Sequence, residues 1–361
     1  MKFTTASETR RWAVSSVSAA CALMLALTGC GDDGSGPGDE NGNEDGDSAE
    51  GERLTIYSGR DEGNVGPLFE QFEEDSGIQL DVRYGDSAEL TAQILEEGEA
   101  TPADVYFTLE VGGINALASD GQITTLSDEV LEQVSEAYVV DDGTWVATAA
   151  RARVLAYNPD NVDVEDLPET IDELTGEEWQ ERVGFAPTNS SFQAFISGFR
   201  AVDGDDRVAQ WLSDFAANDP ESFDNNRAII EGVENGTVDV GLVNHYYYYK
   251  MVEENGEENV HFLPHYITGG DPLGIPVVGG IAVLESSEMQ EEGNELISFL
   301  LSEEAQQHFA DDTAEYPVRP GVESTEHDLP PLEELGPPPM DLAEVASMEE
   351  TLALLQDAGL L

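Results

Sequence analysis

Residues 54–107 decide the fold, and they read LTIYSGRDEGNVGPLFEQFEEDSGIQLDVRYGDSAELTAQILEEGEATPADVYF. Apolar residues at 54–57 predict a buried strand. The next apolar residues recur at the spacing of one helix face, at Val65, Leu68, Phe69 and Phe72. The alternation then continues with strand patterns at 78–84 and 103–107 and helix patterns at 90–95 and 112–120. This order predicts an α/β fold with a parallel sheet wrapped by helices, which binds ligands at the carboxyl ends of its strands.

A second region with the same alternation follows. Its predicted strands are 154–157, 183–185 and 238–243, and its predicted helices are 191–202, 206–216 and 226–235. A Pro/Gly-rich stretch, 269–280, leads into another buried strand at 281–284. Residues 318–341 are rich in Pro and Glu, which is typical of a surface passage, and a final helix is predicted at 342–358.

Residues 1–30 have the three parts of an export signal: a basic start, an uncharged apolar run from Trp12 to Gly29, and a small-residue cleavage region. The final four residues, Leu27-Thr28-Gly29-Cys30, resemble a bacterial lipobox, in which the cysteine receives lipid and becomes the new N-terminus. Eighteen uncharged residues could also form an uncleaved single-span anchor. Arg10 and Arg11 in front of Trp12 leave both general (Sec) and twin-arginine (Tat) export open.

Residues 31–52 contain nine acidic residues and no basic or aromatic one, which predicts a solvated disordered tether. The two cysteines are Cys21, which leaves with the signal, and Cys30. The mature chain therefore has no thiol for a disulfide or a nucleophile. A lipid on Cys30 would hold the protein at the outer face of the cytoplasmic membrane, in the cell envelope.

The chain of 361 residues has 76 acidic and 14 basic residues and a formal net charge of −62. This charge excludes a phosphate-neutralising nucleic-acid surface and polybasic docking to anionic lipid. Hydrophobic residues make up 40%, as in ordinary globular proteins. Self-repulsion on this scale is relieved by screening ions, so the composition favours a halophilic protein. An ordinary acidic secreted protein is the alternative.

The run Asn244-His245-Tyr246-Tyr247-Tyr248-Tyr249 follows a predicted strand and precedes a helical pattern. A free tyrosine has a pKa of about 10, but a trivalent cation can displace the phenol proton by its own charge. Adjacent tyrosines therefore suit Fe³⁺ better than Ca²⁺ or Zn²⁺. Aromatic core packing is the alternative for such a run.

Other polar groups follow predicted strands, at Arg60-Asp61, at Glu110 and at Thr188-Asn189-Ser190-Ser191. The last of these suits an anion at a helix N-terminus or a simple helix cap. The sequence contains no glycine-rich nucleotide loop, HExxH or GxSxG motif, and its five histidines are scattered. These features predict a binding protein rather than an enzyme.

Eight stretches in order resemble the ferric-ion-binding proteins of bacterial ABC iron importers. They are LTIYSGRDE (54–62), YGDSAELTAQILEEG (84–98), TPADVYF (101–107), ARARVLAYN (150–158), GFAPTNSSFQAF (184–195), VDVGLVNHYYYY (238–249), DPLGIPVVGGIAVLESS (271–287) and AEYPVR (314–319). The resemblance implies a two-lobed type II periplasmic-binding-protein (Venus-flytrap) fold with the ligand in the interlobe cleft. It also implies a monomer that delivers Fe³⁺, held with a synergistic anion such as carbonate or phosphate, to an ABC transporter permease.

The resemblance also assigns site residues. The family's tyrosine pair falls on Tyr246 and Tyr247. The N-lobe ligands are less well matched, because Asp61 stands where many members have histidine and Glu110 follows Leu109 where many have Glu or Gln. The residues that correspond to the anion site are Asn189, Ser190, Ser191, Asn226, Asn244, Arg60 and Arg151. Arg153 is a further arginine at this place, with a structural salt bridge as its alternative role.

Domain boundaries follow from the same comparison with the family. They are 1–30 signal peptide, 31–52 tether, 53–150 first part of the N-lobe, 151–275 C-lobe, 276–327 return to the N-lobe, and 328–361 a C-terminal helical segment on the C-lobe. A protein of the same fold that binds another solute, such as a polyamine, thiamine or an organic anion, is the alternative function.

Because the lipobox places the lipid on Cys30, Cys30→Ser should abolish lipid attachment and lipoprotein-type cleavage. Mass spectrometry of the wild-type N-terminus is expected to show a lipidated Cys30 as the first residue. An unmodified Cys30, or a chain that retains residues 1–30, would contradict the assignment.

Overall fold

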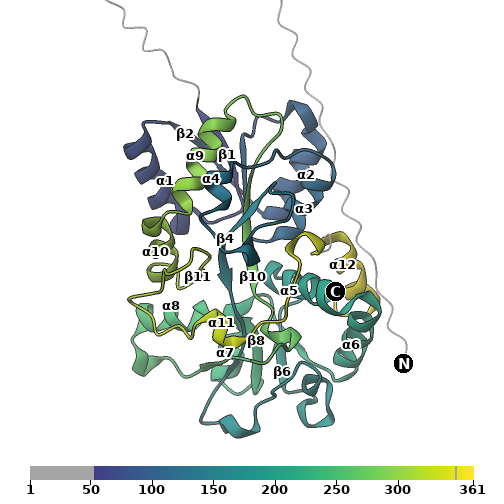
Figure 1. The fold of residues 1–361 in the computed structure, drawn as a ribbon. Coiled ribbons are helices and arrows are strands. Elements are labelled where there is room, and N and C mark those ends of the chain that lie inside the picture. The colour runs from purple at the N-terminus through teal and green to yellow at the C-terminus, as the bar shows by residue number, and fades with distance from the viewer. Residues whose placement is uncertain (1–52, 346–347) are drawn as a thin grey trace, which may run out of the picture. The chain divides into compact units, whose positions relative to one another are not determined.

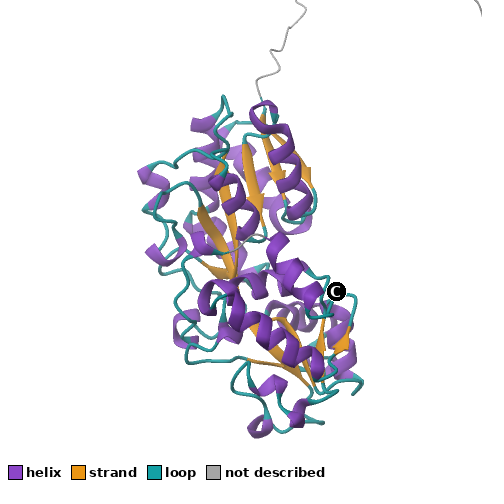
Figure 2. Ribbon diagram, turned by 90° about the vertical axis from the view of Figure 1, so that its right-hand side faces the viewer, coloured by secondary structure: helices purple, strands orange, loops and turns teal. Residues whose placement is uncertain are grey.

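The computed structural model describes residues 53–345 and 348–361, which belong to one compact unit (Figure 1). The predicted export signal, lipidated Cys30 and tether lie outside these residues. The described part forms two lobes, each built on one β-sheet whose faces are covered by helices (Figure 2). None of the helices in this part of the chain is long and apolar enough to cross a membrane.

The N-lobe sheet has the order β11-β4-β10-β3-β1-β2. Its strands are β1 (Leu54–Ser58), β2 (Leu80–Tyr84), β3 (Val105–Thr108), β4 (Val146–Arg151), β10 (Val277–Val283) and β11 (Tyr316–Pro317). Its helices are α1 (Glu62–Ser76), α2 (Ser87–Glu97), α3 (Val111–Ser119), α4 (Asp128–Leu131), α9 (Gln290–Leu300) and α10 (Glu303–Asp311). β1 pairs in parallel with both β2 and β3, so the predicted strand–helix alternation and the parallel pairing of these three strands are confirmed. The sheet as a whole is mixed, because β4, β10 and β11 pair antiparallel.

Helix α1 shows how local sequence sets these elements. Its four predicted core residues are all buried. The helix ends at Gly77, which has a φ of +77° and donates its N–H to the carbonyl of Glu73 at 3.0 Å. A left-handed residue is sterically easy only for glycine. The cap therefore fixes where the chain turns back into β2.

The C-lobe sheet has the order β7-β6-β8-β5-β9. Its strands are β5 (Arg153–Tyr157), β6 (Val183–Phe185), β7 (Glu221–Ser222), β8 (Val240–Asn244) and β9 (Leu263–His265). Its helices are α5 (Ser190–Asp203), α6 (Asp205–Ala217), α7 (Asn226–Glu234) and α8 (Tyr246–Asn255). The predicted second α/β region is confirmed by these elements, although β8 begins two residues later than expected.

The two sheets share one pattern, which includes an exchanged strand. In the N-lobe, the antiparallel strand β10 arrives from the C-lobe and lies between β3 and β4. In the C-lobe, the antiparallel strand β5 arrives from the N-lobe and lies between β8 and β9. This repeat is one of topology. Only the N-lobe sheet is interrupted in sequence, because β5–β9 of the C-lobe sheet lie between β4 and β10 in the chain.

The chain first crosses between the lobes through a single residue. β4 ends at Arg151, β5 begins at Arg153, and the buried Ala152 between them accepts a hydrogen bond from the N–H of His245 at 3.1 Å. The second crossing runs from β9 to β10 over residues 266–276. Figure 1 shows β4 and β10 side by side where they lead toward the C-lobe.

The C-terminal segment contacts both lobes rather than the C-lobe alone. Leu335, Leu342 and Val345 belong to the N-lobe core, whereas Leu355 of α12 (Met348–Asp357) belongs to the C-lobe core. The short helix α11 (Leu332–Leu335) precedes this passage.

The prediction of one helix over 342–358 is wrong at its start. Residues Leu342–Glu344 form only a 3₁₀ turn, and α12 begins at Met348. The side-chain amide of Asn115 donates to the carbonyls of Leu342 at 2.8 Å and Val345 at 3.2 Å. These carbonyls are the groups that a continuous helix would need for its own hydrogen bonds.

Some of the many acidic residues lie in the first turns of helices, where the helix dipole favours negative charge. Several helices begin with two acidic residues in the first turn: Asp205 and Asp206 in α6, Glu291 and Glu292 in α9, Glu303 and Glu304 in α10, and Glu349 and Glu350 in α12. Negative charge at a helix N-terminus is stabilising by about 0.3–1 kcal/mol at a surface. This local gain does not remove the repulsion that a net charge of −62 creates over the whole molecule.

Thermal stability should therefore rise with salt. The melting temperature of the purified protein is expected to increase steadily from dilute buffer to molar NaCl, because the Debye length falls to about 3 Å at 1 M. Calorimetry over a salt series measures this change. A melting temperature that is independent of salt would argue against halophilic adaptation.

Candidate functional site

The ends of central strands from both sheets meet at the junction of the lobes. Arg151 donates a hydrogen bond to the carbonyl of Leu109, directly after β3. Arg153 lies in register with Asn244, the last residue of β8. The residues just after β3 and β8 therefore flank Ala152 from opposite lobes. Such strand ends are where α/β sheets bind ligands.

The tyrosine run divides into two pairs with different surroundings. The rings of Tyr246 and Tyr247 are stacked, with centroids 4.5 Å apart, in the first turn of α8. Tyr248 packs edge-on against Phe262, and Tyr249 donates its hydroxyl to the carbonyl of Asp328 at 2.9 Å. The second pair thus serves packing, whereas the first pair presents two phenol groups beside the lobe junction.

Burial raises the pKa of Tyr246 well above its ordinary value. The adjoining Tyr247 raises it further, while Arg151 and Asn244 act in the opposite direction. The phenol of Tyr246 is therefore neutral at pH 7 unless a cation displaces its proton. A cation bound here has to release protons, so its affinity falls in acid.

Arg153 carries a buried positive charge next to this pair. It is 1% exposed and donates from Nη1 to Oδ1 of Asn244 at 2.8 Å and to Oγ of Ser191 at 3.3 Å. Within the described residues its Nε and Nη2 have no hydrogen-bond partner. Burial lowers the pKa of Arg153 to about 10, so the group is still charged at pH 7. Unpaired donors on a buried cation suit an anion.

The N-terminus of α5 completes this polar wall. Asn189 caps the helix, since its Oδ1 accepts from the N–H of Ser191 at 3.1 Å and from its hydroxyl at 2.6 Å. The buried Asn226 donates to Oδ1 of Asn189 at 3.2 Å and to Oγ of Ser191 at 3.3 Å, and it lies 3.5 Å from the Tyr247 hydroxyl. Capping and anion binding, the two roles considered for this loop, are thus compatible.

On the N-lobe side, two of the arginines assigned to the anion site share a buried carboxylate. Arg60 is 1% exposed and contacts Glu315 at 2.6 Å, and Arg151 lies 3.9 Å from the same carboxylate. The guanidinium of Arg60 also lies over the rings of Phe107 and Phe309. These two guanidinium groups therefore share one carboxylate within the lobe, whereas Arg153 has no carboxylate partner among the described residues.

The two proposed N-lobe ligands lie in different environments. Asp61 is exposed at the start of α1, and its charge acts on Lys250 of α8. Glu110 is 7% exposed, and burial raises its pKa, opposed by Arg151 and by the hydroxyl of Ser190. The influence of Ser190, the first residue of α5, and of Arg151 favours the ionised form of this buried carboxyl.

Two residues of this site were not singled out from the sequence, Lys250 and Glu315. Glu315 stands inside the quoted stretch AEYPVR (314–319), but nothing in that stretch marked it as a site residue. No group of three or more His, Cys, Asp and Glu is arranged to hold a metal within 53–345 and 348–361. A metal bound in this part of the chain would therefore need other donors, and the tyrosines supply oxygen.

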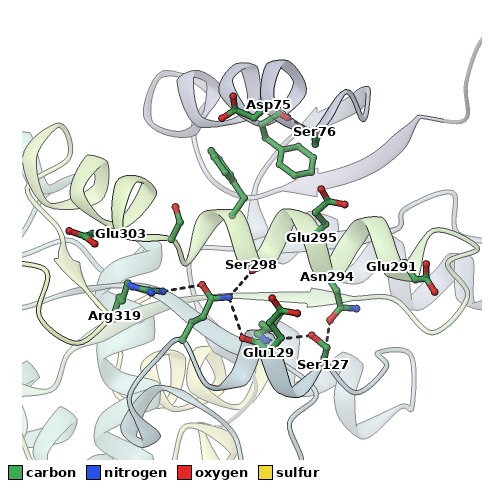
Figure 3. Close-up of a pocket in the computed structure, with 15 residues that line it drawn as sticks. Asp75, Ser76, Ser127, Glu129, Glu291, Asn294, Glu295, Ser298, Glu303 and Arg319 are labelled. Carbon is green, nitrogen blue, oxygen red and sulfur yellow. Dashed lines mark hydrogen bonds between the residues drawn. The ribbon is translucent and has the colours of Figure 1, made fainter.

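A separate hollow of about 570 Å³ lies on the N-lobe between α1, α4 and α9 (Figure 3). Several of its polar groups form hydrogen bonds with one another. Gln133 donates to Oγ of Ser298 at 2.7 Å and accepts from Arg319 at 3.0 Å, and Asn294 accepts from the N–H of Ser127 at 2.9 Å. This hollow contains none of the predicted site residues.

Comparison with known proteins agrees with this architecture. The family described as bacterial extracellular solute-binding protein matches residues 101–340. The major ferric iron-binding protein of Neisseria meningitidis is 28% identical over 85% of this chain and 93% of its own length. Iron uptake protein A1 of Synechocystis is 30% identical over 75% and 77%. The crystal structure of iron-bound HitA from Pseudomonas aeruginosa has a TM-score of 0.78 at 36% identity, over 85% of this chain and 99% of that one.

Replacing Glu315 with Gln should lower the free energy of unfolding by about 3 kcal/mol at pH 7, because two buried guanidinium groups lose their counter-charge. Burial alone would raise the pKa of Glu315, but Arg60 and Arg151 hold it below its ordinary value of 4.5. A depressed folded-state pKa stabilises the fold above the unfolded value, and this contribution is lost as pH falls through the folded value. The difference between the proteins should therefore shrink in acid.

Urea unfolding of both proteins at pH 7 and at about pH 3 measures this difference, since the window lies below the ordinary pKa of a glutamate. Glu323→Gln, at an exposed position, is the matched control and should change little. A Glu315→Gln protein as stable as wild type at pH 7 would show that the two arginines need no carboxylate.

Proposed function

The chain belongs to the family of bacterial extracellular solute-binding proteins and is not an enzyme, and from this premise we propose that it binds Fe³⁺ between its lobes through Tyr246 and Tyr247. The observation that carries the proposal is the stacked pair of phenols, 4.5 Å apart, at the start of α8. Tyr248 and Tyr249 have packing partners instead.

The chemistry of the pair supports a trivalent cation. The Tyr247 hydroxyl lies 3.5 Å from Nδ2 of Asn226, which hydrogen-bonds to Ser191 as Arg153 does. Two phenolates would bring two negative charges to this place, and a trivalent cation would compensate them. The raised pKa of Tyr246 means that a weakly charged cation would not deprotonate it at pH 7.

A synergistic anion such as carbonate or phosphate would bind against the C-lobe wall. The donors available there are the Nε and Nη2 of Arg153 and the Nδ2 of Asn244, which are buried and lack partners within the described residues. The N-terminus of α5 with Ser190 and Ser191 adds amide and hydroxyl donors. Arg60 and Arg151, which share Glu315, would contribute through their charge.

Asp61 and Glu110 are proposed as the N-lobe ligands. Asp61 is exposed, and its charge acts on Lys250, which lies beside Tyr246. Glu110 is more constrained, because it is buried. Metal coordination would favour the ionised form of either carboxylate, which matters most for Glu110 because burial raises its pKa.

The cell-level role follows from the family. We propose that a lipid on Cys30 holds the protein at the outer face of the cytoplasmic membrane and that it delivers iron to an ABC transporter permease as a monomer. Lobe closure around the cation would provide the difference that the permease reads, since a ligand shifts a conformational equilibrium only by its differential affinity.

Iron binding should produce a visible phenolate-to-iron charge-transfer band on addition of ferric citrate, and this band should weaken in acid. Tyr246→Phe and Tyr247→Phe should each reduce iron affinity by more than about 100-fold. Each change removes a direct ligand, and even the outer partners of metal ligands contribute about 10–100-fold. Spectrophotometric titration against a competing chelator measures both effects.

Tyr248→Phe is the matched control, since it removes the same hydroxyl from a ring that packs against Phe262, and it should bind iron almost as wild type does. If the Tyr246→Phe/Tyr247→Phe double variant binds iron as tightly as wild type, the site is wrong. An organic anion held by Arg153 would then become the leading candidate ligand.

A further inference from the structure

The first turns of two helices from different lobes face each other beside the candidate site. Asp61, the residue directly before α1, and Asn64 are three positions apart, and Tyr246 and Lys250 on α8 are four apart. Residues at these spacings lie on one face of a helix turn. A contact between Asn64 and Lys250 therefore links the lobes immediately beside two of the proposed iron ligands.

This contact is a hydrogen bond between the lobes. Nζ of Lys250 donates to Oδ1 of Asn64 at 3.2 Å. The same ammonium lies 5.6 Å from the centroid of the Tyr246 ring, within the range of a cation–π interaction. One side chain thus connects α1 of the N-lobe with a candidate iron ligand of the C-lobe.

Asn64, which accepts this hydrogen bond, has a backbone that is fixed within the N-lobe. The backbone N–H of Asn64 donates to the carbonyl of Asp61 at 2.9 Å. Its own carbonyl lies 2.8 Å from Nε2 of His308 in α10. Asn64 is therefore an anchored acceptor for the lysine, not a mobile surface group.

The lysine itself is unusual in this chain. Residues 53–361 contain a single lysine, Lys250. Its ammonium is half-buried among Glu315, Arg60, Asp61 and Glu253. Ordering a long side chain costs conformational entropy, so a defined position needs partners on both sides. Asn64 and Tyr246 are those partners.

We propose that Lys250 is an interlobe latch, a positioning residue that stabilises the closed lobes through Asn64, holds Tyr246 at the N-lobe wall and slows release of the bound cation. The part concerning the cation rests on the proposed function, whereas the part concerning lobe closure does not. A contact that exists only when the lobes meet shifts the equilibrium toward closure by its own free energy.

Lys250→Met keeps the length of the side chain and removes the charge and the donor, and Asn64→Ala removes the acceptor. Each variant should release iron to a competing chelator about tenfold faster. That factor corresponds to about 1.4 kcal/mol, close to the contribution of a hydrogen bond to a charged group. The wavelength of the charge-transfer band should not change, because the tyrosine pair is intact.

A double variant, a conservative variant of Lys250 and a control at another ion pair test whether the effect comes from the Lys250–Asn64 contact. The Lys250→Met/Asn64→Ala double variant should be no faster than either single variant, because both remove one interaction. Lys250→Arg retains a charged donor and should restore slow release. Arg182→Met removes the same charge from a pair with Asp239 inside the C-lobe and should leave release unchanged.

Small-angle scattering of the purified protein without added iron gives an independent readout. Lys250→Met and Asn64→Ala should each increase the radius of gyration, because the lobes open more often. If both single variants release iron as slowly as wild type and have the same radius of gyration, the latch is wrong. That result would not contradict the iron site. If wild type binds no iron but Lys250→Met still expands, the latch stands and the proposed cation is wrong.

Discussion

The structure depends on how the chain compensates two buried arginines that flank a single residue. Arg151 ends one sheet and Arg153 begins the other, so their charges cannot move to the surface without breaking a strand. Arg151 is met by Glu315, which also pairs with Arg60. Arg153 has only neutral partners, Asn244 and Ser191, among the hydrogen bonds of the described residues. This asymmetry leaves Arg153 without a carboxylate partner beside the tyrosines.

Basic residues are scarce in this chain, so their clustering at the lobe junction indicates a role for positive charge there. Residues 53–361 contain ten arginines and one lysine in an overwhelmingly acidic chain. Four of these eleven, Arg60, Arg151, Arg153 and Lys250, gather where the lobes meet. Other arginines form exposed or partly exposed pairs, such as Arg207 with Asp172 and Arg227 with Glu254. The surface therefore attracts cations from solution generally, while the lobe junction is the part able to hold an anion as well.

The sequence predicted those elements well whose apolar pattern depends only on residues close to one another in the chain. The core face of α1 is as expected, because it depends on residues within a few helical turns of one another. The final helix was placed too early because Asn115, far away in sequence, takes the carbonyls of Leu342 and Val345. The run of four tyrosines stands out in the sequence, but the choice of Tyr246 and Tyr247 within it depended on the family resemblance. The ion pair of Arg60 with Glu315 could not be predicted, since it joins residues 255 positions apart.

The exchanged strands have a consequence for the order in which this protein can fold during synthesis. β10 lies between β3 and β4, yet it is encoded after the whole C-lobe. The N-lobe sheet therefore remains split until residue 283 has left the ribosome. The C-lobe sheet, by contrast, is complete once β9 has been made. A chain whose N-terminal lobe must wait for its middle strand stays open to chaperones and export machinery for most of its translation.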